Sequence, residues 1–153
     1  MLLLISGLAF FFLVSLLIQN SSQFIQVWVP PWPWRQYSYP LMIAACILMA
    51  AAILPRSWLR THLRRPALLA VSLWGIAHLL SNGDLASILL FGTLTLWSLW
   101  QYARNFPAST LGAGKEFSVQ WDVAAIMAGL LAWVVLYLGH GELFGTGLDI
   151  WYP

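Results

Sequence analysis

The chain has 153 residues, of which 61% are hydrophobic and only 8% are charged, with a net charge of +2. A soluble domain of this length needs roughly a quarter of its residues charged to cover its surface. The composition therefore excludes a soluble domain. It predicts an all-α, polytopic bundle of membrane-spanning helices, built as a single domain over residues 1–153.

The first predicted span covers residues 2–18 and extends toward residue 27 in its longest form. Its apolar run is longer than that of a secretory signal, and no basic residue precedes it, so we interpret it as a retained membrane helix. Residues 27–34 then alternate tryptophan with proline. Proline interrupts helices and tryptophan favours the membrane interface, so this segment is predicted to be an interfacial loop.

The second predicted span covers about residues 39–54, and the third covers residues 66–81 with a proline in its first turn. The connection between them holds four arginines and His62. We interpret this arginine cluster as a topology determinant that contacts anionic membrane lipids, with His62 in solvent or facing lipid. No nucleic-acid partner is expected.

The fourth predicted span runs from residue 84 to about residue 102, and the fifth from residue 121 to about residue 140. The second and fourth connections together hold six of the seven lysines and arginines. Basic loops stay on the cytoplasmic side of a membrane, so these two connections are predicted to be cytoplasmic. With about five transmembrane helices, the N-terminus is then inside and the C-terminus outside.

The residues Asn82, Gly83 and Asp84 form a predicted tight turn between the third and fourth spans, and Asp84 is expected to cap the helix that follows. His78 lies one turn before this segment, and His140 lies at the end of the fifth span. The third and fifth spans cross the membrane in the same direction. The two histidines are therefore predicted to lie at one depth, near the outer face.

Histidines inside membrane spans are candidates for function, and imidazole is a frequent ligand of metal ions and haem iron. Gly75, three residues before His78, would let either a flat macrocycle or another helix approach closely, and Tyr137 has the same spacing from His140. Two interpretations follow. His78 and His140 hold a haem or a metal ion, the latter with help from Asp84, or both are interfacial residues without a ligand. No catalytic residue can be named.

Two segments resemble the signature of NnrU-type membrane proteins: His-Leu-Leu-Ser-Asn-Gly-Asp at residues 78–84, and His-Gly-Glu-Leu-Phe-Gly at residues 140–145. The resemblance covers about residues 64–145 and includes the Trp-Asp pair at residues 121–122. It implies a protein of the bacterial inner membrane, associated with denitrification and nitric oxide metabolism. The family is related to the plant zeta-carotene isomerase, which binds haem b through histidine. The resemblance thus implies haem b ligated by His78 and His140, in a redox or isomerase-like role.

The chain also departs from that family pattern. Residues 13–15 are Leu-Val-Ser, where family members usually carry a histidine, and one further span of the family is not found in this sequence. The alternative function is therefore that of a non-enzymatic accessory subunit, packed in a larger respiratory or photosynthetic membrane complex.

Overall fold

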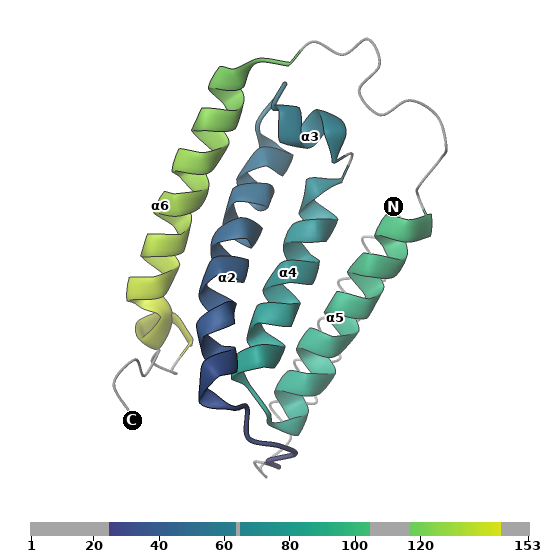
Figure 1. Ribbon diagram of the computed structural model, residues 1–153, viewed down its shortest axis with the longest axis vertical. Coiled ribbons are helices and arrows are strands. Elements are labelled where there is room, and N and C mark those ends of the chain that lie inside the picture. Colours follow the sequence, from purple (N-terminus) through teal and green to yellow (C-terminus); the bar gives the residue numbers. More distant parts are fainter. Residues whose placement is uncertain (1–24, 64, 105–116, 145–153) are drawn as a thin grey trace.

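A computed structural model describes residues 25–63, 65–104 and 117–144, and every named element in this part of the chain is a helix. The helices are α2 (Trp32–Ile53), α3 (Trp58–His62), α4 (Pro66–Ser81), α5 (Leu85–Arg104) and α6 (Val119–Phe144). The four long helices run side by side in alternating directions, and the short helix α3 lies across one end of them (Figure 1). Helix α2 packs against both α4 and α6, and α5 packs against α4.

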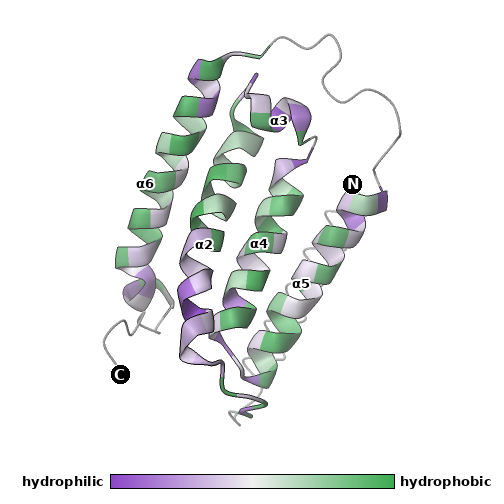
Figure 2. Ribbon diagram, in the orientation of Figure 1, coloured by the Kyte–Doolittle hydropathy of each residue, from purple (hydrophilic) through white to green (hydrophobic). Residues whose placement is uncertain are grey.

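Three of these helices, α2, α5 and α6, are long and apolar enough to cross a membrane, whereas α4 is apolar but has only 16 residues. Hydrophobic residues cover the middle of the helices, and hydrophilic residues gather toward the two ends (Figure 2). The predicted helical membrane bundle is thereby confirmed at this level. The predicted first span lies outside the described residues, as does most of the connection between α5 and α6.

The turn between α4 and α5 has the predicted structure. Helix α4 begins at Pro66, and the Asn82 backbone N–H donates to the carbonyl of His78 over 2.8 Å where the helix ends. The Asp84 carboxylate accepts a hydrogen bond of 2.8 Å from the backbone N–H of Ser87, so it caps α5 as expected. We call this end of the bundle, with Asn82 to Asp84 and His78, the histidine end.

The start of α2 corrects one prediction. The helix begins at Trp32, about seven residues before the predicted start, so the predicted interfacial loop is wrong for residues 32–34. Pro33 lies in the first helical turn, where no N–H is needed for the helix, and Pro40 is accommodated inside the helix. The loop prediction holds only for the residues up to Pro31, which precedes the helix.

Residues 25–28 lie against the turn at the histidine end. The backbone N–H groups of Val27 and Trp28 both donate to the carbonyl of Gly83, over 2.9 and 3.1 Å, and Leu85 N–H donates to the carbonyl of Ile25 over 2.9 Å. A Cβ at position 83 would overlap the carbonyl of Trp28, so glycine is required there. The segment before α2 is thus fastened to the α4–α5 turn by backbone hydrogen bonds.

The opposite end, which we call the arginine end, contains the unpredicted helix α3. Ser57 caps this helix by accepting a hydrogen bond of 3.0 Å from the Arg60 backbone N–H. The Arg60 guanidinium reaches back and donates to the carbonyls of Ile53 and Leu54, over 3.2 and 3.1 Å. Arg60 therefore satisfies carbonyls that the end of α2 would leave without a partner.

Helix α6 is tied to the arginine end by Asp122 in its first turn. Its two carboxylate oxygens accept from the backbone N–H groups of Trp58 and Leu59, over 2.9 and 3.2 Å. Nearby, the His62 ring stacks on Trp58, with 4.3 Å between ring centroids, and meets Phe117 edge-on at 5.8 Å. The His62 imidazole is thus partly exposed and lies against two aromatic rings, and the expectation of a solvated or lipid-facing side chain stays a prediction.

Candidate functional site

His78 lies in the last turn of α4, and its ring orientation is set by the helix itself. The Nδ1 atom is 2.9 Å from the carbonyl oxygen of Trp74. A carbonyl oxygen can only accept, so Nδ1 carries the hydrogen and donates it. The lone pair of the ring then lies on Nε2, the arrangement usual for a histidine that ligates a metal.

Two aromatic rings hold the plane of the His78 imidazole. Phe91 of α5 stacks on it with 4.3 Å between centroids and 24° between planes, and the Trp74 ring lies 4.9 Å from both. Phe91 was missed from the sequence. A signal existed, because His78 and Phe91 are nearly equidistant from the turn at Gly83 and Asp84, and such residues meet across an antiparallel helical hairpin.

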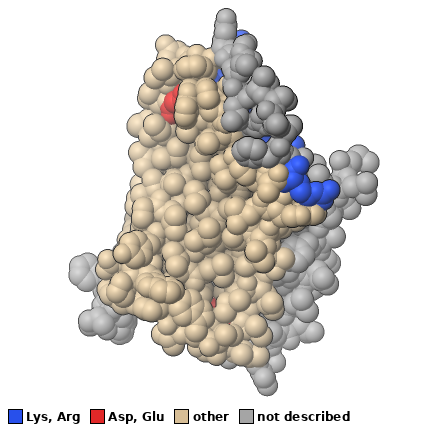
Figure 3. Space-filling model, turned by 45° about the vertical axis from the view of Figure 1, so that its right-hand side comes forward, with Lys and Arg blue, Asp and Glu red and all other residues tan. Residues whose placement is uncertain are grey.

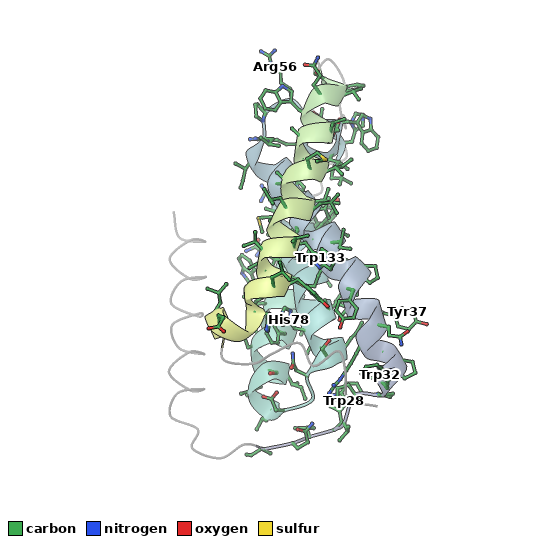
Figure 4. The ribbon with its side chains drawn as sticks, turned by 90° about the vertical axis from the view of Figure 1, so that its left-hand side faces the viewer. Trp28, Trp32, Tyr37, Arg56, His78 and Trp133 are labelled. Atoms are coloured by element: carbon green, nitrogen blue, oxygen red, sulfur yellow. The ribbon has the colours of Figure 1, made fainter. Side chains whose placement is uncertain are left out.

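His140 lies near the C-terminal end of α6, and α6 and α4 both end at the histidine end of the bundle (Figure 1). Both histidines therefore lie toward the same end of the bundle. Seen from the α6 side, His78 lies between Trp133 and the end that carries Trp28 and Trp32 (Figure 4). The structure thus brings the two candidate ligands toward one region from helices on either side of α2.

Tyr137 lies one turn before His140 and packs α6 onto α2. Its ring stacks on Trp133, with centroids 5.2 Å apart, and meets Tyr39 of α2 edge-on at 6.1 Å. Aromatic pairs in these geometries add to the stability of a packed interface. The structure therefore places Tyr137 where it can hold the His140 segment of α6 against α2.

Gly75 faces the neighbouring helix α5. A Cβ at this position would overlap the Thr95 hydroxyl and would lie 3.0 Å from the Phe91 carbonyl. One turn away, the Ser72 and Ser98 hydroxyls share a buried hydrogen bond of 2.7 Å between the same two helices. Of the two roles expected for Gly75, the structure shows the close approach of another helix, because Thr95 occupies the space beside it.

The candidate metal ligands at the histidine end are two imidazoles, those of His78 and His140. Asp84 uses its carboxylate to cap α5, and residues 25–63, 65–104 and 117–144 contain no group of three or more His, Cys, Asp or Glu that could hold a metal ion. Metal ions held by protein ligands alone usually need three or four of them, whereas a haem iron takes two axial ligands. Two imidazoles are fewer ligands than a bare metal ion usually takes, and they equal the number of axial ligands of a haem iron.

Replacing Asp84 with alanine tests whether its carboxylate is a cap or a ligand. Loss of an N-cap costs about 1 kcal/mol of stability, and asparagine caps as well as aspartate does. We expect Asp84→Ala, but not Asp84→Asn, to lower the thermal unfolding temperature of the protein in detergent. A cap role would be contradicted if both variants lost a bound metal or cofactor while keeping wild-type stability.

The fold and these side chains define a polytopic helical membrane protein with two histidines, from different helices, directed to one end of the bundle. The chain belongs to the NnrU family, since the family described as NnrU protein matches residues 2–147. The match begins at residue 2, so it also covers the N-terminal part of the chain, whereas the motif resemblance begins only at about residue 64. No curated protein and no solved structure gives a significant match.

Proposed function

We propose that this NnrU-family protein binds haem b in the bacterial inner membrane, with His78 and His140 as axial ligands near the outer face. The observation that carries the proposal is the hydrogen bond from His78 Nδ1 to the Trp74 carbonyl, which leaves Nε2 as the ligating atom. The position of His140 near the end of α6, at the same end of the bundle as His78, supports the second ligand. The histidine end is the outer end in this proposal, because the arginines gather at the opposite end.

Each neighbouring residue then has a definite task. The Trp74 carbonyl keeps the proton of His78 on Nδ1, and Phe91 restrains rotation of the ring. Tyr137 and Tyr39 hold the helix that carries His140. A bound haem would supply one-electron redox chemistry at its iron, which fits a redox role linked to nitric oxide and denitrification, or an isomerase-like role.

An absorption spectrum of the full-length protein tests this proposal. The protein is expressed with ample haem supply, purified in mild detergent, and measured oxidised and then reduced with dithionite. We expect a Soret band and, on reduction, the sharp visible bands of a six-coordinate low-spin haem. A wild-type protein that folds in detergent but shows no Soret band would overturn the proposal.

The accessory-subunit alternative would use the outer face of α6. Met127, Leu131, Val135 and Leu138 follow one another at helical spacing and are 57–75% exposed. Such a stripe in a membrane contacts either lipid or a partner helix. If the protein extracted in mild detergent migrates with a larger assembly, this alternative gains support, and a small solitary particle argues against it.

A further inference from the structure

The arginine end carries a basic and aromatic corner, formed by Arg56, Trp58 and Arg65 around helix α3. All three side chains are exposed, with 44% of Trp58 accessible. In the face shown in Figure 3, some basic side chains are visible near the top and others on the right-hand side at about mid-height, and most of the remaining described surface is uncharged. Tryptophan and arginine together are typical of a membrane interface.

Arg56 has a backbone conformation that its side chain disfavours. Its φ is +57°, and it is the one non-glycine residue with positive φ among the described residues. Glycine is the usual residue at such positions after a helix, because Cβ crowds the backbone in the left-handed region. The Arg56 carbonyl accepts a hydrogen bond of 3.0 Å from Ser118 N–H, which helps to hold this conformation. An arginine in a strained position suggests that the guanidinium itself has a function.

Two charged groups next to this corner, Arg60 and Asp122, are already engaged. Arg60 donates to the carbonyls at the end of α2, and both oxygens of Asp122 accept backbone N–H groups of α3. The Arg56 side chain instead points away from the helices at the extreme end of the bundle (Figure 4). Its guanidinium is thus presented outward, two residues before the exposed Trp58 in the chain.

We propose that Arg56, with Trp58 and Arg65, binds the phosphate group of an anionic phospholipid headgroup. A guanidinium presents paired N–H donors that match phosphate oxygens, and an indole beside it suits the boundary between headgroups and acyl chains. The corner follows directly on the end of α2, a helix long and apolar enough to span the membrane, so it lies at headgroup level. This site is separate from the two histidines and does not depend on haem.

The decisive variant is Arg56→Gly, because it removes the guanidinium and at the same time relieves the left-handed backbone. The full-length protein is purified in mixed micelles of phosphatidylglycerol and phosphatidylcholine, and retained lipid is measured by native mass spectrometry. The wild type is expected to retain phosphatidylglycerol in preference. Arg56→Gly should bind it about fivefold more weakly, as expected for one arginine at a membrane surface, with unchanged or higher thermal stability.

Arg35→Gln is the matched control, since Arg35 is an exposed arginine at the start of α2, at the histidine end. Its phosphatidylglycerol retention should equal that of the wild type. Equal retention by Arg56→Gly and wild type would overturn the proposal, as would an equal loss in Arg35→Gln or no preference over phosphatidylcholine. Displacement of the lipid by millimolar inorganic phosphate would also overturn it, and would indicate a site for free phosphate.

Discussion

Replacing His78 with alanine is expected to abolish the low-spin spectrum that the proposed haem complex would show. The His78 ring is held by the Trp74 carbonyl and the Phe91 ring, and the substitution removes the Nε2 atom that would bind the iron. Loss of residues that merely support a metal ligand costs about tenfold or more in affinity, and loss of the ligand itself should cost at least as much. His140→Ala should have the same effect, seen as a high-spin spectrum or as protein without haem.

The third histidine provides the matched control. His62 lies at the arginine end, stacked on Trp58, so His62→Ala should keep the wild-type spectrum. Haem occupancy is measured as the ratio of Soret to protein absorbance at equal protein concentration. If His78→Ala and His62→Ala gave the same spectrum as the wild type, His78 would not be a ligand. A loss in all three variants would indicate a general effect on folding.

The second large effect is expected from Gly129→Ala in the middle of α6. A Cβ at this position would lie 2.5 Å from the Cα of Ile47 and 2.6 Å from its backbone nitrogen. Backbone atoms cannot move aside alone, so α6 must shift away from α2. Such overpacking typically costs about 1–3 kcal/mol. We expect a lower unfolding temperature in detergent and, because α6 carries His140, a reduced haem content.

Gly92→Ala provides the comparison for this substitution. Gly92 lies inside α5, and a Cβ there would meet no described atom within 4 Å. Alanine favours a helix over glycine by about 1 kcal/mol, so this variant should be as stable as the wild type or more stable. Circular dichroism during heating measures both variants. Equal destabilisation by the two substitutions would show that the α2–α6 contact at Gly129 is not the cause.

The sequence predicted well those parts of the fold that are set by contacts between residues close together in the chain. Pro66 in the first turn of α4 and Asp84 before α5 mark helix ends through contacts within three or four residues. The predicted start of α2 is too late because the prolines of residues 27–34, among them Pro33, are strong helix breakers in general, whereas Pro40 already lay inside the predicted span. Both are accommodated in this helix, one of them in its first turn.

Helix α3 could not be predicted because what holds it is far away in the chain. It has five residues, too few to be stable from propensity alone, and two of its N–H groups are capped by Asp122. The sequence suggested only that a Trp-Asp pair opens the last helix. The hydrogen-bond partners of Asp122, the amides of Trp58 and Leu59, can be identified only from the structure, in which α6 lies beside the connection between α2 and α4.

The candidate site, like the fold, was predicted only in part from the sequence. Topology alone suggested that His78 and His140 share one side of the membrane, and the structure places both toward one end of the bundle. The sequence left the role of Gly75 open between a macrocycle and a helix, and the contact with Thr95 selects the helix. Phe91 was not foreseen, since a ring contact between helices depends on their rotation as well as on their depth.

The hydrogen bonds of Asp122 have a consequence for biosynthesis. They join residues that are separated by 63 and 64 positions in the chain, so they can form only after Asp122 has been synthesised and has left the ribosome. Until that moment, the amides of Trp58 and Leu59 depend on water or lipid headgroups for their hydrogen bonds. Insertion of α6 is therefore the step that completes the arginine end, and a chain that stops before residue 122 would assemble α2, α4 and α5 without that closure.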